Sequence, residues 1–188
     1  MKKTFYYNAL ASEKLYDFAL QLNTLIDDTI SENQEIIYLC IGSDRSTGDS
    51  LGPLVGYRLD ALSSFKGHVY GTLKNPVHAV NLSSSLDEIY SMHENPFIIA
   101  IDASLGTKSH LGYVTLCDSP LKPGLGVKKL LPSVGSLSVT GIVGFSGVMD
   151  AVILQTTRLS DVMDLSNYIA GGILLASHMR RKTLLNVL

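Results

Sequence analysis

The sequence predicts an α/β fold, a three-layer α/β/α sandwich with a mostly parallel sheet. Two observations favour it. Residues 35–41 and 96–102 are near-continuous apolar runs of strand length, which are typical of strands buried on both faces of a parallel sheet. Segments with apolar residues at helical spacing alternate with such runs along the chain, and helices between strands are the pattern of a covered parallel sheet.

The individual elements follow from the same two periodicities. The first helix is expected over residues 12–30, where charged residues separate apolar ones at Leu15, Phe18, Leu22, Leu25 and Ile26. The same spacing predicts three more helices, over residues 50–62, 79–93 and 160–182. Short apolar or β-branched runs predict five strands, over residues 35–41, 68–73, 96–102, 113–118 and 137–143.

The chain length sets the domain organisation. With 188 residues, the protein can bury a large core without disulfides or metals. We expect a single α/β domain over residues 1–188, with residues 1–34 as an N-terminal helical extension. The longest irregular segment is residues 118–136, which is rich in proline and glycine, and loops of this length in compact domains are often functional.

Composition excludes several classes of partner. The formal net charge is −2, so the sequence has no basic footprint for nucleic acid. The longest apolar stretch near the C-terminus, residues 168–179, is too short to cross a bilayer. Cys40 and Cys117 lie in apolar runs and form no C-x-x-C motif, which indicates free thiols in a reducing compartment. We therefore expect a cytoplasmic protein with no nucleic-acid or membrane partner, and a homo-oligomeric state stays open.

Two acidic residues stand at the ends of predicted strands. Asp49 lies in the loop after the 35–41 strand, and Asp102 ends the 96–102 strand. Sites in open α/β sheets form outside the carboxyl ends of the strands, so the two acids are expected to meet there. Two carboxylates in a partly dry cleft share a proton, and one can then activate water while the other polarises a carbonyl. Two acids can equally hold a metal ion, and Asp49 could instead cap the following helix.

Three further polar residues are candidates for substrate contact. Asp44 and Arg45 share the loop with Asp49, and Arg45 could pair with an acid or with a substrate carboxylate. His78 follows the second predicted strand and so falls at the same sheet edge as the acids. The nucleotide-binding motifs G-x-x-x-x-G-K and G-x-G-x-x-G are absent, and we expect no cofactor and no resident metal.

Four motifs resemble those of a known peptidase family. "GSDRSTGDSLGP" (residues 42–53) resembles the first signature of the bacterial spore germination protease, and "IDASLG" (101–106) resembles its second acidic strand end. "PGLGV" (123–127) and "GIVGFSGVMDAV" (141–152) resemble two later motifs, in the same order. The hydrogenase maturation endopeptidases have a similar first motif, in which an acid stands three residues before a glycine, as Asp49 precedes Gly52 here. The short YyaC-type spore protease-like proteins are also similar, over roughly residues 36–180.

This resemblance implies a fold of the phosphorylase/hydrolase type and an atypical aspartate peptidase with Asp49 and Asp102 as its acids. It also implies a role in endospore formation or germination, in the mother cell or forespore. The maturation endopeptidases carry a metal-contacting histidine after the second acid, whereas residues 111–177 contain no histidine, which argues against nickel sensing.

The function expected from these observations is hydrolysis of a peptide bond in a protein substrate. Two alternatives stay open. One is a catalytically inactive module of the same fold that binds a spore protein or peptide. The other is a metal-dependent hydrolase that uses the same acids.

Overall fold

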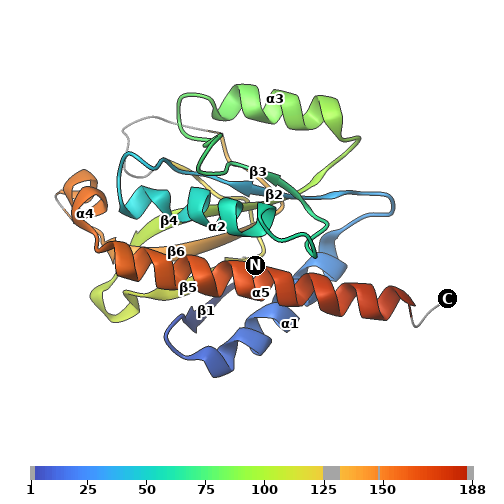
Figure 1. Ribbon diagram of the computed structural model, residues 1–188, viewed down its shortest axis with the longest axis horizontal. Helices are drawn as coiled ribbons and strands as arrows, with labels where there is room; N and C mark the ends of the chain where they lie inside the picture. Colours follow the sequence, from blue (N-terminus) through green and yellow to red (C-terminus); the bar gives the residue numbers. More distant parts are fainter. Residues whose placement is uncertain (1–2, 125–131, 148, 186–188) are drawn as a thin grey trace.

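The computed structural model describes residues 3–124, 132–147 and 149–185 (Figure 1). Its strands are β1 (Thr4–Asn8), β2 (Ile36–Cys40), β3 (His68–Tyr70), β4 (Phe97–Gly106), β5 (Tyr113–Cys117) and β6 (Leu137–Phe145). Its α-helices are α1 (Leu15–Thr29), α2 (Leu51–Asp60), α3 (Leu82–Met92), α4 (Asp150–Thr156) and α5 (Leu159–Leu185). Short 3-10 helices are η1 (Ser12–Lys14), η2 (Gly48–Ser50) and η3 (Lys108–His110).

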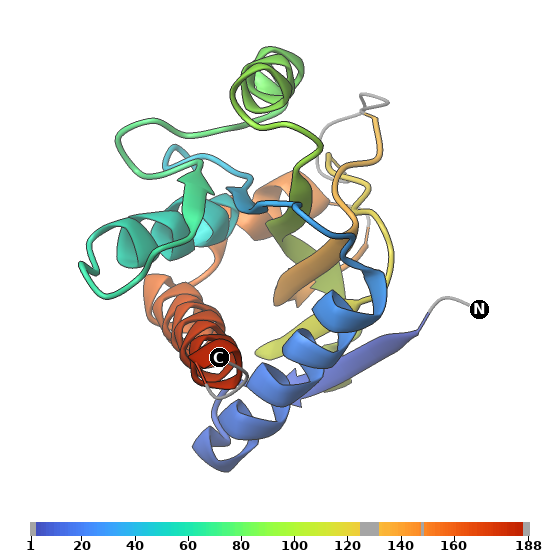
Figure 2. The same ribbon diagram turned by 90° about the vertical axis from the view of Figure 1, so that its right-hand side faces the viewer.

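The strands form one mixed sheet in the order β1-β5-β6-β4-β2-β3. The pairs β6–β4, β4–β2 and β2–β3 are parallel, whereas β5 runs antiparallel to both β6 and β1. Helices cover both faces, with α1, α2 and α5 on one and α3 on the other (Figure 2). The predicted three-layer sandwich with a mostly parallel sheet is therefore confirmed.

Side chains alternate between the two faces along the central strands. In β2, Tyr38 and Cys40 belong to the larger core under α1, α2 and α5, whereas Ile37 and Leu39 belong to the smaller core under α3. Strand β4 alternates in the same way. Both faces of these strands are buried, because helices cover each of them, and this explains why their sequences are apolar throughout.

The N-terminal segment is more than the helical extension that the sequence predicts. Helix α1 lies within the expected range, but β1 was not predicted, and it adds an edge strand to the sheet beside β5. Helix α1 packs along α5, where the Asn23 side-chain amide donates to the Ala176 carbonyl over 3.0 Å (Figure 2). Phe18 and Leu22 of α1 are fully buried, so the segment forms part of the main core.

Two other elements differ from prediction. Strand β4 continues four residues past Asp102 to Gly106, because β6 on one side pairs with it as far as Gly106, with a register shift between Ser104 and Leu105. Helix α4 was not predicted, and none of its residues is buried, so no apolar stripe marks it in the sequence.

Part of the irregular segment 118–136 lies outside the described residues. Cys40 and Cys117 are buried free thiols, as expected. Over the described ranges, no helix combines the length and apolar character needed to span a membrane.

Candidate active site

Two glycines bring the start of α2 against the end of β2. Gly42 has φ +142°, and a Cβ there would lie 2.0 Å from the Asp49 carbonyl oxygen. A Cβ on Gly52 would lie 2.0 Å from the Ile41 carbonyl oxygen. Both contacts are shorter than any side chain allows, so the loop between them can fold back over the strand end only with glycine at these positions. The loop is closed by the Ser43 N–H, which donates to the Asp49 carbonyl over 3.0 Å.

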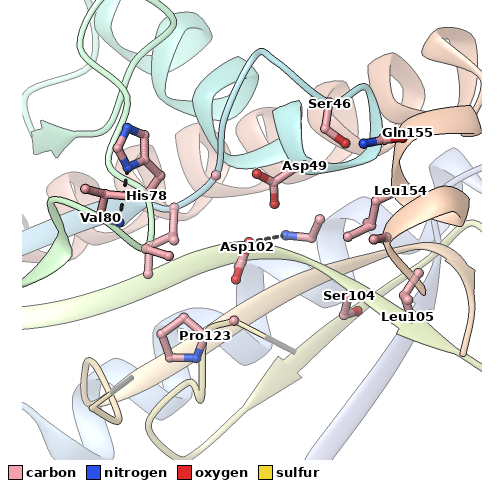
Figure 3. Close-up of a pocket in the computed structure, with 16 residues that line it drawn as sticks. Ser46, Asp49, His78, Val80, Asp102, Ser104, Leu105, Pro123, Leu154 and Gln155 are labelled. Carbon is pink, nitrogen blue, oxygen red and sulfur yellow. Dashed lines mark hydrogen bonds between the residues drawn. The ribbon is translucent and has the colours of Figure 1, made fainter. Parts of the chain in front are cut away.

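Asp49 lies in η2, directly before α2. The residue at the N-cap of α2 is Ser50, and no side chain makes a capping hydrogen bond there, so capping does not explain Asp49. Its side chain points into the space above β4 (Figure 3). The N-terminus of α2 carries a partial positive charge, which favours an ionised carboxylate at this place.

Asp102 lies in β4 at the level where its neighbour β2 departs from the sheet. The last β2 residue, Cys40, pairs with Ile101, and Asp102 is the next residue along β4. Its Oδ1 atom accepts a hydrogen bond from the Ala103 N–H over 2.8 Å. The residue is only 8% exposed, although its side chain faces Asp49 (Figure 3). Asp102 was expected at the end of its strand. It lies instead within a longer strand, just beyond the last residue that pairs with β2.

Both acids line one cavity of about 300 Å³. His78 borders it on one side, with Ser104 of β4 and Leu154 of α4 on the other (Figure 3). A second hollow, of about 310 Å³, shares Asp102, Ser104 and Gly124 with the first and continues across the sheet toward β1. The two hollows adjoin at Asp102, and together we call them the acid cleft.

Burial and mutual repulsion shift the titration of the acids. Burial raises the pKa of Asp102 well above its usual value, and the Asp49 charge raises it further, against the opposing Ala103 hydrogen bond. Burial also raises the pKa of Asp49, although the Ser43 backbone and His78 oppose this shift. Asp102 is therefore the group that keeps its proton to higher pH, and Asp49 is the group that ionises first.

The raised pKa of Asp102 predicts the effect of Asp102→Asn on stability. The folded protein binds more protons at Asp102 than the unfolded chain does, so its stability falls as pH rises from the unfolded toward the folded pKa. Asparagine does not titrate and can still accept from the Ala103 N–H. We expect the melting temperature of Asp102→Asn to equal or exceed that of wild type. Each kcal/mol of unfolding free energy gained raises it by roughly 2–4 °C, and the difference from wild type is expected to grow with pH.

Thermal denaturation at several pH values checks this, with Asp87→Asn on the exposed side of α3 as the matched control. A loss of about 1–3 kcal/mol in the Asp102 variant at every pH would instead show that the carboxyl group of Asp102 stabilises the fold.

The other predicted site residues fall into two groups. His78 lines the cavity, and its Nδ1 atom accepts a hydrogen bond from the Val80 N–H over 3.3 Å. Asp44 and Arg45 are exposed and are not among the residues that line either hollow. The substrate-binding role of all three stays a prediction.

Some cavity residues were not predicted from the sequence. Leu154 and Gln155 come from α4, which carries no recognisable signal of its own. Ser46 lies in the Asp49 loop and also lines the cavity, and its buried hydroxyl has no hydrogen-bond partner. A buried hydroxyl without a partner costs free energy, so Ser46 is a candidate for contact with a bound group. The sequence offers only its place beside Asp49 as a signal.

A cluster of metal-ligating side chains lies outside the acid cleft. Within the part of the chain that the structure describes, the group of three or more clustered metal-ligating side chains is Glu35, His68 and His93, at the opposite edge of the sheet. Among the described residues, Asp49 and Asp102 belong to no such group of three.

Comparison with known proteins gives the family. The model described as "Protein of unknown function (DUF1256)" matches residues 4–172. The chain belongs to this family. The "Uncharacterized protein YyaC" of Bacillus subtilis (strain 168) is 48% identical over 157 residues, which are 82% of this chain and 77% of the relative. The predicted resemblance to YyaC is therefore confirmed, and the range of the DUF1256 match includes both acids of the cleft.

A likeness to a solved structure was also found. The crystal structure of a NiFe hydrogenase maturation protease, HycI from Thermococcus kodakarensis KOD1, aligns with a TM-score of 0.46 and 16% sequence identity. The alignment covers 81% of this DUF1256 chain and 98% of the HycI chain.

Proposed function

We propose that this protein is an acid-pair hydrolase, a peptidase of atypical aspartate type that cleaves a protein substrate in a sporulating cell. The observation that carries the proposal is the pair of acids in the acid cleft. Asp49 and Asp102 face one another, and each has a raised pKa (Figure 3). Two interacting acids with unequal pKa values provide a base and an acid at the same pH.

The unequal pKa values assign the roles. Asp49, which ionises first, accepts a proton from a water molecule as the water attacks the carbonyl carbon of the peptide bond. Asp102, still protonated, donates a hydrogen bond to the carbonyl oxygen and stabilises the negative charge that develops there. The proton held by Asp49 then passes to the leaving amine, the C–N bond breaks, and the products are a carboxylic acid and an amine.

The shape of the acid cleft supports an extended substrate. The second hollow prolongs the cavity across β4, β6 and β5, and Asp102 lies where the two meet. A peptide laid along this recess would present one bond at the acids and place its flanking residues in the hollows on each side. The exposed sides of Ser104 and Lys122 offer polar contacts to such a chain.

The sporulation context rests on the motifs around the acids. The loop with Asp49 and the strand with Asp102 resemble the acidic signatures of the spore germination protease. The substrate that we propose is accordingly a protein of the developing or germinating spore.

Mass spectrometry of new peptide termini tests the proposal. Purified wild type, Asp49→Asn, Asp102→Asn and the Asp87→Asn control are each incubated with proteins extracted from sporulating cells, with and without EDTA. We expect new termini with wild type and the control, in both conditions, and none with either acid-pair variant. The Asp87 side chain is exposed on α3, so its replacement leaves the acid cleft intact.

Two other outcomes would favour the binding module or the metal-dependent hydrolase instead. If wild type yields no termini while stably capturing a partner, the protein is a binding module and the peptidase proposal is wrong. If EDTA abolishes cleavage, the acids act through a metal ion.

A further inference from the structure

Three side chains with metal-ligating atoms meet at the amino ends of the parallel strands, away from the acid cleft. Glu35 directly precedes β2, His68 is the first residue of β3, and His93 directly follows α3. Asp102 lies near the opposite ends of these strands, beyond the last residue of β2. The three residues, which we call the amino-edge cluster, are therefore separate from the residues proposed to catalyse hydrolysis.

The distances in the amino-edge cluster suit a shared ion. The ligand atoms all lie within 4.8 Å of one another. Glu35 Oε2 is 2.6 Å from His93 Nδ1, and Glu35 Oε1 is 3.7 Å from His68 Nε2. Atoms bound to one tetrahedral zinc ion at about 2.0–2.1 Å are roughly 3.3 Å apart, so small side-chain rotations bring all three to that separation.

A second residue fixes the orientation of His93. The Tyr70 hydroxyl lies 3.0 Å from His93 Nε2, and the Glu35 carboxylate lies at the other ring nitrogen. If Nε2 carries a proton and donates to Tyr70, Nδ1 can give up the proton that it shares with Glu35 and serve as the ligand atom. A ligating histidine whose second nitrogen is held by a hydrogen bond is the usual arrangement at protein zinc sites.

The backbone also positions the cluster. The Phe97 N–H donates to the Glu35 carbonyl over 2.8 Å, and β2 and β3 pair through Ile37 and His68. His93 is 8% exposed, whereas the side chains of His68 and Glu35 are about half exposed, at 48% and 50%. His93 is thus buried, whereas His68 and Glu35 face the solvent, from which an ion can enter.

We propose that Glu35, His68 and His93 bind one zinc ion, with water as the fourth ligand. Two imidazoles and one carboxylate form a set that zinc accepts, whereas calcium and magnesium prefer sites made of oxygen atoms. The ion ties together β2, the three-residue edge strand β3 and the end of α3, and binding stabilises the folded protein.

Calorimetric titration of the full, tag-free chain with zinc chloride tests this site. We expect one zinc ion per chain and a zinc-dependent rise in melting temperature that EDTA reverses. Replacing the exposed ligand in His68→Gln is expected to weaken zinc binding at least about 100-fold, and Tyr70→Phe about tenfold, through loss of the hydrogen bond that orients His93. Since His68 is half exposed, its variant is expected to stay folded.

Two control variants locate the ion. His110→Gln removes a partly exposed histidine that stacks on Tyr6, and Asp49→Asn removes an acid of the cleft. Both are expected to bind zinc as wild type does. Zinc affinity that is unchanged in His68→Gln and Glu35→Gln, or absent in wild type, would show that the cluster is only a hydrogen-bond network. Loss of zinc binding in Asp49→Asn alone would move the ion to the acid cleft and overturn the site.

Discussion

Replacing Asp49 or Asp102 by asparagine is expected to lower kcat by at least about 10³-fold on a peptide that the wild type cleaves, because each change removes one half of the acid–base pair. The double variant is expected to be no more than a fewfold slower than either single variant, since effects within a catalytic unit are far from additive. Steady-state kinetics on the three variants measures both effects. KM is expected to change little, because the walls of the acid cleft remain.

The same measurements over a range of pH test the assigned roles. Activity is expected to rise as Asp49 loses its proton and to fall as Asp102 loses its own, with both limbs above the ordinary range for aspartate because both pKa values are raised. Single-variant losses that multiply in the double variant, or a profile without a falling limb, would contradict a coupled acid pair.

Gly52→Ala is expected to be strongly destabilising, by about 3 kcal/mol or more. The new Cβ would lie 2.0 Å from the Ile41 carbonyl oxygen, a backbone atom that cannot move aside without shifting β2 or α2. Because Asp49 lies three residues before Gly52, the same shift moves its carboxylate away from Asp102. Activity per folded molecule is therefore expected to fall as well.

Chemical denaturation gives the free energy of unfolding for this variant, and Gly147→Ala is its matched control. Among the described residues, and apart from its chain neighbours, no atom lies within 4 Å of the position that a Cβ on Gly147 would take, so alanine there is expected to change stability by less than about 0.5 kcal/mol. Equal stability of the two alanine variants would mean that the approach of α2 to β2 is not as tight as described.

The central strands could be predicted because both of their faces are covered. Covered strands need apolar side chains at every position, and residues 36–40 and 97–101 show this directly. Strand β1, in contrast, was missed because it is a short edge strand, with polar residues at both ends and Tyr6 half exposed between them. Helix α4 was missed because it has no buried face.

The candidate site was predictable only in part, for a related reason. Asp49 and Asp102 follow from the rule that sites form where parallel strands end. Asp44 and Arg45 share the loop with Asp49, but the 3-10 turn at Gly48–Ser50 brings Asp49 to the cleft and leaves the other two exposed. Sequence proximity does not fix the direction of a side chain within a loop. Ser46 and Leu154 reach the cavity through tertiary packing, which leaves no local signature.

The pairing of β1 with β5 bears on how the chain folds during synthesis. Thr4 meets Cys117, 113 positions later, and Asn23 of α1 meets Ala176, 153 positions later. At about 10 residues per second, the first thirty residues wait roughly 15 seconds on the ribosome before all their partners have been made. During that time Phe18 and Leu22 lack the α5 surface that buries them. The packing of α1 is therefore a late step, which waits until α5 has been made.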